Sequence, residues 1–293
     1  MDECDSKNDH AVTVIQKSTD GAWIPDVEAL NKILKSKNII NKKVMVVSIA
    51  GPSRSGKSFL LNLILKAFYA AEQGRWVQED MTMATNNFGF RCRGGARRET
   101  SGIALWSKPF LFKNEEDEEL AVLLMDTEGF FDADSTLEDC AKIFSLSSLL
   151  SSLQIYNLKE KLQLDFLKHV EIFGKYGSYA TKKEKAKPFQ NLLYLVRDWS
   201  CEEDYESIEE DFLEMTRALA EELCFGRFLG AKEILRRELT CQELCAFFIV
   251  SGEVVLDTVY LECTETYDNE IDTVPFNFYS IIFKAFSIKN MYA

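Results

Sequence analysis

The stretch Gly51-Pro-Ser-Arg-Ser-Gly56-Lys57-Ser58 matches the pattern G-x-x-x-x-G-K-[ST]. In this pattern the glycines let the backbone bend, so that successive N–H groups point at phosphate oxygens. We expect Lys57 to reach the β- and γ-phosphates of a nucleotide, and the Ser58 hydroxyl to ligate Mg²⁺. An apolar run precedes the pattern and a helical pattern follows it. This context favours a phosphate-binding loop (P-loop) over a chance glycine turn.

A second candidate segment is Leu123–Gly129, in which Asp126-Thr127-Glu128-Gly129 ends an apolar run. An Asp at the end of a buried strand suits a contact with Mg²⁺ through a water, and the Gly129 amide can approach a γ-phosphate. The alternative is an ordinary polar strand terminus. Beside a P-loop, the phosphate-site interpretation is favoured.

The third candidate is Arg197-Asp198, which follows the apolar run Asn191–Val196. A carboxylate here can accept two hydrogen bonds from guanine, from N1–H and from the exocyclic amine. Adenine carries an acceptor at N1 and lacks the amine, so it would be rejected. The commoner guanine motif N-K-x-D is absent from the sequence, and a surface ion pair is the alternative reading of Arg197-Asp198.

Alternating strand and helix patterns surround these segments. Val44–Ala50 is β-branched and predicts a buried strand, and the apolar positions after Ser58 predict a buried helix. Ile103–Phe112 and Leu120–Met125 predict two strands of a hairpin joined by an acidic block. We therefore predict an α/β fold, with a mostly parallel central sheet and helices on both faces.

Three more helices and one more strand complete this prediction. Ser135 and Glu138 have capping-box spacing, which predicts a helix through about Ser152. The further segments are a helix over about Lys161–Tyr176, a strand over Asn191–Val196 and an acidic amphipathic helix with a stripe from Ile208 to Leu223.

Composition excludes several classes of protein. The chain has 293 residues, 46% of them hydrophobic, and a net charge of −13, which argues against a nucleic-acid-coating protein. Eight cysteines occur without a secretory signal, so reduced thiols in the cytosol are expected. Cys241 and Cys245 are only a weak candidate for a zinc site. We expect no membrane-spanning helix; the apolar stretch Phe276–Phe286 would pack as a terminal element or lie on a membrane surface.

Six motifs occur in series between Ala11 and Ser200: ALNKIL, VSIAGPSRSGKSFLLN, RGGARRETSGI, LLMDTEGFFD, SSLQIYNL and KPFQNLLYLVRDWS. Over this range the chain resembles the atlastins, in the dynamin-related GTPase group that includes the guanylate-binding proteins. The resemblance implies a P-loop GTPase G domain that hydrolyses GTP to GDP and phosphate with Mg²⁺. It also implies GTP-dependent pairing of G domains, as a homodimer or a heterodimer.

The resemblance also implies roles for individual residues. Arg54 matches the catalytic arginine, which moves onto the phosphates when two G domains meet, and it would act with Lys57 and Thr100. Thr100 lies in the first switch (Arg93–Thr100) and would ligate Mg²⁺ with Ser58 and, through water, Asp126; Arg93 would support the dimer-competent switch. Glu128 stands where atlastins typically have Gln, in the second switch. The expected nucleotide-binding residues are Gly51, Arg54, Ser55, Gly56, Lys57, Ser58, Phe59, Gly129, Arg197 and Asp198.

The resemblance decays after Ser200. We expect a polar tail at residues 1–11, a G domain at 12–231 and a divergent remnant at 232–293, without the family's three-helix bundle or transmembrane hairpin. The same sequence would result if the chain were a shortened or mis-spliced product. Family members fuse endoplasmic reticulum tubules, which this chain alone is not expected to do. We expect it in the cytoplasm, or at the cytosolic face of that membrane through relatives.

Two alternative functions stay open. The first is a catalytically poor module that binds GTP and regulates full-length relatives by pairing with them. The second is an ATPase or small-molecule kinase, which shares the P-loop but leaves Arg197-Asp198 unexplained.

Overall fold

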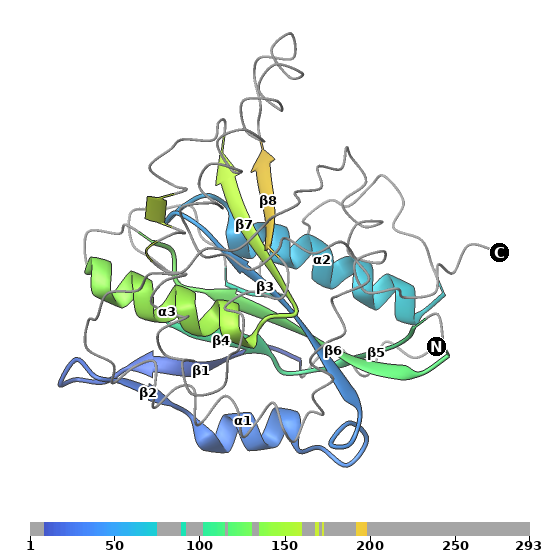
Figure 1. Cartoon of the computed structure of the whole chain (residues 1–293). Coiled ribbons are helices and arrows are strands. Elements are labelled where there is room, and N and C mark those ends of the chain that lie inside the picture. Colours follow the sequence, from blue (N-terminus) through green and yellow to red (C-terminus); the bar gives the residue numbers. More distant parts are fainter. Residues whose placement is uncertain are drawn as a thin grey trace, which may run out of the picture.

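The computed structural model describes residues 9–74, 89–91, 102–114, 117–130, 135–159, 168–169, 172 and 192–197. Figure 1 shows the arrangement of the elements. The strands are β1 (Ala11–Lys17), β2 (Trp23–Pro25), β3 (Lys43–Ala50), β4 (Ile103–Trp106), β5 (Phe110–Lys113), β6 (Glu119–Thr127), β7 (Leu153–Lys159) and β8 (Leu192–Arg197). The helices are α1 (Val27–Leu34), α2 (Lys57–Glu72) and α3 (Leu137–Leu150).

In the described part of the chain these strands form one mixed sheet in the order β2-β1-β4-β6-β3-β7-β8, and β5 pairs with β6 beside this path. Strands β6, β3, β7 and β8 run parallel to one another. The strands β2, β1, β4 and β5 extend the sheet by antiparallel pairing. The parallel centre places the carboxyl ends of four strands at one edge, which is where ligands bind in open α/β sheets.

Side-chain alternation along the central strands divides the core into two layers. Val44 and Val46 of β3 pack with α1 and α3 on one face of the sheet, while Met45 and Val47 pack with α2 on the other. Strand β6 alternates in the same way, because successive side chains of a strand point to opposite faces. The expected α/β fold, with a sheet covered on both faces, is therefore confirmed (Figure 1).

Two predicted boundaries were wrong. The segment Ile103–Phe112 forms two strands, β4 and β5, and Pro109 lies between them; proline has no N–H to donate to a ladder. Helix α3 is capped by Thr136 rather than Ser135, because the Thr136 hydroxyl accepts the backbone N–H of Asp139 at 3.0 Å and Asp139 completes the capping box. The hairpin between β5 and β6 is confirmed.

Other elements were missed or lie beyond the description. Strands β1, β2 and β7 and helix α1 were not predicted. The predicted helix at Lys161–Tyr176 falls mostly outside the described residues, and the acidic helix at Ile208–Leu223 falls wholly outside them. None of the helices that the structure describes is long and apolar enough to cross a membrane.

Candidate phosphate-binding site

The loop between β3 and α2 has the backbone of a phosphate cradle. Gly51 (φ 144°), Arg54 (φ 63°) and Gly56 (φ 79°) all have positive φ. A Cβ on Gly51 would overlap the carbonyl oxygen of Asn157, so this position requires glycine. Gly56 is the N-cap of α2 and makes no side-chain capping bond to it. The first amides of α2, with the positive end of its dipole, are therefore suited to an anion.

Lys57 is buried at the start of α2, with 7% of its surface exposed. Its Nζ donates a hydrogen bond to the Pro52 carbonyl across the loop, at 2.8 Å. Burial lowers the pKa of Lys57 to about 8, although the nearby Asp126 and Glu128 carboxylates oppose the shift. A Cβ on Gly129 would lie 2.8 Å from Lys57 Nζ, so Gly129 leaves the ammonium group room at the loop.

Ser58 and Asp126 meet where α2 begins and β6 ends. The Ser58 hydroxyl donates to Asp126 Oδ2 at 2.7 Å, and the Asp126 side chain is buried. The parallel register of β3 and β6 pairs Ile49 with Asp126, which brings the carboxylate to the level of the loop. A hydroxyl and a carboxylate oxygen side by side are the hard ligands that Mg²⁺ prefers, so these two residues fit a magnesium site.

Backbone bonds join the loop to the residues after β6. The Ser53 N–H donates to the Phe130 carbonyl at 2.8 Å, and the Phe130 N–H donates to the Gly51 carbonyl at 3.2 Å. The buried Thr127 hydroxyl donates to the Ile49 carbonyl at 2.7 Å. The P-loop and the chain from Thr127 to Phe130 are thus joined by hydrogen bonds, although the two segments lie far apart in the sequence.

Asn157 is a residue of the site that sequence reasoning missed. Its buried Nδ2 donates to the backbone oxygen of Ser55 at 2.8 Å and to the Ser55 hydroxyl at 3.0 Å. Strand β7 lies next to β3, so the Asn157 amide holds the middle of the P-loop against the neighbouring strand. The available signal was weak: Asn157 is one of two amide residues, with Gln154, in the run LQIYNL, near the carboxyl end of a strand that was not predicted.

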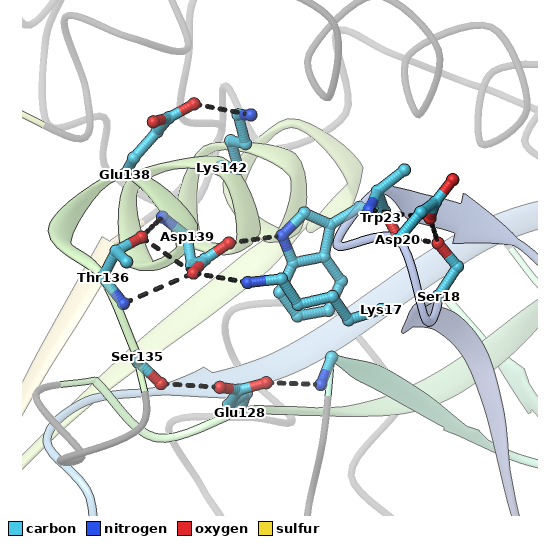
Figure 2. Close-up of polar contacts among 12 residues, drawn as sticks. Lys17, Ser18, Asp20, Trp23, Glu128, Ser135, Thr136, Glu138, Asp139 and Lys142 are labelled. Atoms are coloured by element: carbon cyan, nitrogen blue, oxygen red, sulfur yellow. Dashed lines mark hydrogen bonds and ion pairs between the residues drawn. The ribbon is translucent and has the colours of Figure 1, made fainter.

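Glu128, the residue after β6, connects three parts of the chain. Its Oε2 accepts the Gly102 N–H at 2.8 Å and its Oε1 accepts the Ser135 hydroxyl at 2.8 Å, while its own N–H donates to the Gly102 carbonyl at 2.7 Å. Figure 2 shows Ser135 bonded to this carboxylate near the start of α3. The side chain therefore ties the beginning of β4 to the approach to α3.

Asp139 forms a second polar cluster on α3, beside the first (Figure 2). Trp23 Nε1 donates to its Oδ1 at 2.9 Å, and Lys17 Nζ and the Thr136 hydroxyl donate to its Oδ2, each at 2.8 Å. Burial by itself would raise the pKa of Asp139, but these hydrogen bonds outweigh it and hold the pKa at about 2. The cluster fastens the β1–β2 hairpin to α3.

We expect this cluster to make stability pH-dependent in acid. The folded pKa of Asp139, about 2, lies below the ordinary aspartate value of 3.8. Between pH 4 and pH 2 the unfolded chain therefore binds more protons than the folded chain. Asp139 contributes about 1–2 kcal/mol to the free energy of unfolding above pH 4, and this contribution is lost as the pH falls toward 2. Urea unfolding at pH 5.5 and pH 3 should show a smaller pH effect in Asp139→Asn than in the wild type. Glu138→Gln is the control, because Glu138 is one residue away, its side chain is 59% exposed, and it pairs with Lys142 instead of the cluster. This variant should keep the wild-type pH effect. Equal pH effects in the wild type and Asp139→Asn would contradict the prediction.

The structure brings most of the predicted site residues together. Gly51, Ser55, Gly56, Lys57, Ser58, Asp126 and Gly129 meet at the loop. Arg54 and Phe59 are exposed beside it, and Phe59 is 39% exposed. The backbone of Arg197 ends β8, and β8 runs parallel to β7 toward the same edge of the sheet. Arg93, Thr100 and Asp198 lie outside the described residues.

Comparisons with known proteins agree with this geometry. Residues 21–223 match the family model described as guanylate-binding protein, N-terminal domain. The chain is 45% identical to Atlastin-1 of Bos taurus over 189 residues, which are 64% of this chain and 33% of that protein. It is 44% identical to Atlastin-2 of Homo sapiens over 175 residues, which are 60% of this chain and 30% of that protein. The matched region thus spans about a third of the length of these relatives. With the family model covering more than half of its residues, this atlastin-like chain belongs to the family of guanylate-binding protein N-terminal domains.

Proposed function

We propose that the chain binds GTP with Mg²⁺ and hydrolyses it to GDP and phosphate. The observation that carries the proposal is the meeting of Lys57, Ser58 and Asp126 at a P-loop with an uncapped helix N-terminus. Membership in the guanylate-binding family supports a guanine nucleotide as the ligand. The similarity to atlastins supports a GTPase of the dynamin-related group.

Each residue of the site would have a separate role in phosphoryl transfer. Lys57 Nζ would exchange its bond to the Pro52 carbonyl for the β- and γ-phosphates, where its charge balances the charge that develops during transfer. The amides of the loop and of the first turn of α2 would hold the phosphate oxygens, and the Gly129 amide would approach the γ-phosphate. Water attacks the γ-phosphorus in line, the bond to the β-phosphate oxygen breaks, and inorganic phosphate leaves with GDP.

Mg²⁺ bound to the triphosphate would neutralise charge on the β- and γ-oxygens. Ser58 would ligate the metal directly, and Asp126, already bonded to Ser58, would hold a water of its coordination shell. Thr100 is the third proposed ligand and comes from the resemblance of the first switch.

Selection of the base is assigned to Arg197-Asp198. Since β8 runs parallel to β7 and β3, it leads the chain to the edge of the sheet that carries the P-loop. A carboxylate following this strand would accept two hydrogen bonds from guanine, which adenine cannot supply. This supports GTP over ATP.

The proposed function also includes pairing with a second G domain and a location in the cell. Arg54 would complete the site when two G domains pair, either as two copies of this chain or as one copy with a full-length relative. We propose that the protein acts in the cytoplasm, or at the cytosolic face of the endoplasmic reticulum through such a relative.

Titration with fluorescent GTP and GDP, with and without Mg²⁺, together with a phosphate-release assay, tests the function. We expect guanine nucleotide binding that Mg²⁺ strengthens, phosphate release, and little displacement by ATP. Binding without release would instead support the regulatory module, and equal displacement by ATP would support an ATPase or kinase. If the purified protein binds no nucleotide, the proposal is wrong.

A further inference from the structure

The peptide bond between Ser55 and Gly56 lies in the P-loop directly before α2, and Asn157 of β7 holds its carbonyl group. The Asn157 side chain is fully buried. Its Nδ2 donates to the Ser55 carbonyl oxygen at 2.8 Å and to the Ser55 hydroxyl at 3.0 Å. Since β7 lies beside β3 (Figure 1), both bonds run from one strand to the loop that follows its neighbour. The Ser55 carbonyl therefore faces β7.

This carbonyl determines where the N–H of Gly56 points. No peptide bond among the described residues is cis, and the C=O and N–H groups of a planar trans peptide point in opposite directions. Because the Ser55 carbonyl faces Asn157, the Gly56 N–H points away from β7. No backbone carbonyl in the described part of the chain accepts this N–H. It is a donor that the backbone of the loop does not use.

The conformation of Gly56 adds this N–H to the amides at the start of α2. Gly56 has φ 79° and ψ 29°, in the left-handed region, and Lys57 begins the right-handed helix. Successive residues of opposite handedness turn their N–H groups toward one concave side, an anion-binding arrangement called a nest. The positive end of the α2 dipole lies at the same place. The Gly56 N–H is therefore suited to a phosphate oxygen.

Glycine by itself does not hold this conformation. It populates positive and negative φ about equally, so Gly56 resists rotation of the Ser55–Gly56 peptide very little. A rotated peptide would change the φ of Gly56 and remove its N–H from the nest. Rotation would also break the bond from the buried Asn157 amide to the Ser55 carbonyl, which is unfavourable for a buried donor. The two bonds from Asn157 therefore select the orientation that presents the N–H to an anion.

The backbone of Asn157 supports the beginning of the same loop. Ala50 of β3 lies opposite Tyr156 of β7, which brings Asn157 to the level of Gly51. A Cβ on Gly51 would lie 2.4 Å from the Asn157 carbonyl oxygen, so the two backbones are already in close contact. One residue of β7 thus touches the start of the P-loop with its backbone and the middle with its side chain.

We infer that Asn157 is a positioning residue of the phosphate site, which turns the Gly56 N–H toward the phosphate groups of the nucleotide. The inference rests on the proposed function, because it requires a nucleotide at the P-loop. The loop amides would serve the phosphates that GDP and GTP share. Loss of the Asn157 bonds should therefore weaken both nucleotides by a similar factor. A hydrogen bond to a charged group corresponds to about 10- to 100-fold in the dissociation constant.

Two variants remove the side-chain donor. Asn157→Leu keeps a similar size, and Asn157→Ala avoids overpacking if leucine does not fit. Gln154→Met is the matched control, because Gln154 is the other buried amide of β7. Its Oε1 accepts hydroxyl groups outside the loop, from Ser48, Ser147 and Ser151. Both Asn157 variants should lose about 10- to 100-fold in affinity for fluorescent GDP and for a non-hydrolysable GTP analogue, and Gln154→Met should keep the wild-type affinities.

The amide resonance of Gly56 separates positioning from a general loss of stability. Cell-free synthesis with ¹³C-carbonyl serine and ¹⁵N-glycine selects the peptides of Ser–Gly pairs, of which the sequence has three, beginning at Ser55, Ser101 and Ser251. Ser101→Ala and Ser251→Ala each remove one signal and so identify that of Gly56. In the wild type this signal should move downfield when GDP binds, because the N–H then donates to a phosphate oxygen.

The same signal is then measured in the variants at saturating GDP. It should move much less in the Asn157 variants than in the wild type, and as in the wild type in Gln154→Met. Circular dichroism monitors folding. If Asn157→Leu does not fold, Asn157→Ala decides, and if neither folds, the shift of the Gly56 signal in the wild type decides.

Four results would overturn the inference: a Gly56 signal that GDP does not move in the wild type, wild-type affinity in a folded Asn157 variant, a loss confined to the GTP analogue, or the same loss in Gln154→Met. Failure of the proposed function would look different. In that case the wild type itself would bind neither nucleotide, before any variant is compared.

Discussion

Arg54→Ala is expected to lower GTP turnover by about 10³-fold or more and to leave the affinity for a non-hydrolysable GTP analogue nearly unchanged. Arg54 is exposed on the P-loop at φ 63°, a conformation that costs a non-glycine residue about 1–2 kcal/mol. Strained residues of this kind concentrate at functional sites. An arginine that reaches the phosphates in the transition state contributes about 10³–10⁵ in rate, because it balances charge that moves toward the leaving group.

Two further substitutions separate the guanidinium from the backbone strain. Arg54→Gly relieves the positive φ and should unfold at a higher urea concentration than Arg54→Ala, yet turn over GTP as slowly. Arg54→Lys retains the charge but not the planar fork, so its turnover should stay well below that of the wild type. Phosphate release at saturating GTP measures the turnover of Arg54→Ala, Arg54→Gly and Arg54→Lys. Wild-type turnover in Arg54→Ala would remove this residue from the mechanism.

Lys57→Met should cost most of the affinity for GTP and GDP alike. The Lys57 ammonium is buried at the loop, and no other lysine or arginine is buried among the residues whose side-chain exposure the structure describes. Truncating one partner of a buried charge pair costs about 2–5 kcal/mol, which corresponds to about 30- to 4,000-fold in the dissociation constant. Methionine keeps the length and apolar character of the stem, so the packing of α2 should survive.

The matched control is Lys66→Met, the same change nine residues further along α2, outside the loop. Fluorescent nucleotide titration of both variants should show a large loss for Lys57→Met and near wild-type affinity for Lys66→Met. If Lys57→Met binds as tightly as the wild type, the loop does not use this ammonium group for phosphate.

The local part of the site could be predicted because its signals are short-range. A β-branched run, a glycine-containing loop and an apolar helix follow one another between residues 43 and 72, and each forms from neighbouring residues. Strand β6, predicted as Leu120–Met125 and observed as Glu119–Thr127, was predictable for the same reason. The two boundary errors have different causes. The break at Pro109 between β4 and β5 was a local signal that the prediction overlooked. At α3 a tertiary contact decides, because Glu128 engages Ser135 and leaves Thr136 to cap the helix.

Taken alone, the sequence determined the P-loop, the strands β3, β6 and β8 of the central sheet, and the residue types suited to phosphate, Mg²⁺ and guanine. It could not show that Asn157 supports Ser55, that Asn62 bonds to the backbone of Phe90, or that Trp23 and Lys17 bind Asp139. These partners lie 102, 28, 116 and 122 residues apart. Side-chain hydrogen bonds over such separations carry no periodic signal, and they form only after the sheet has brought its strands and helices together.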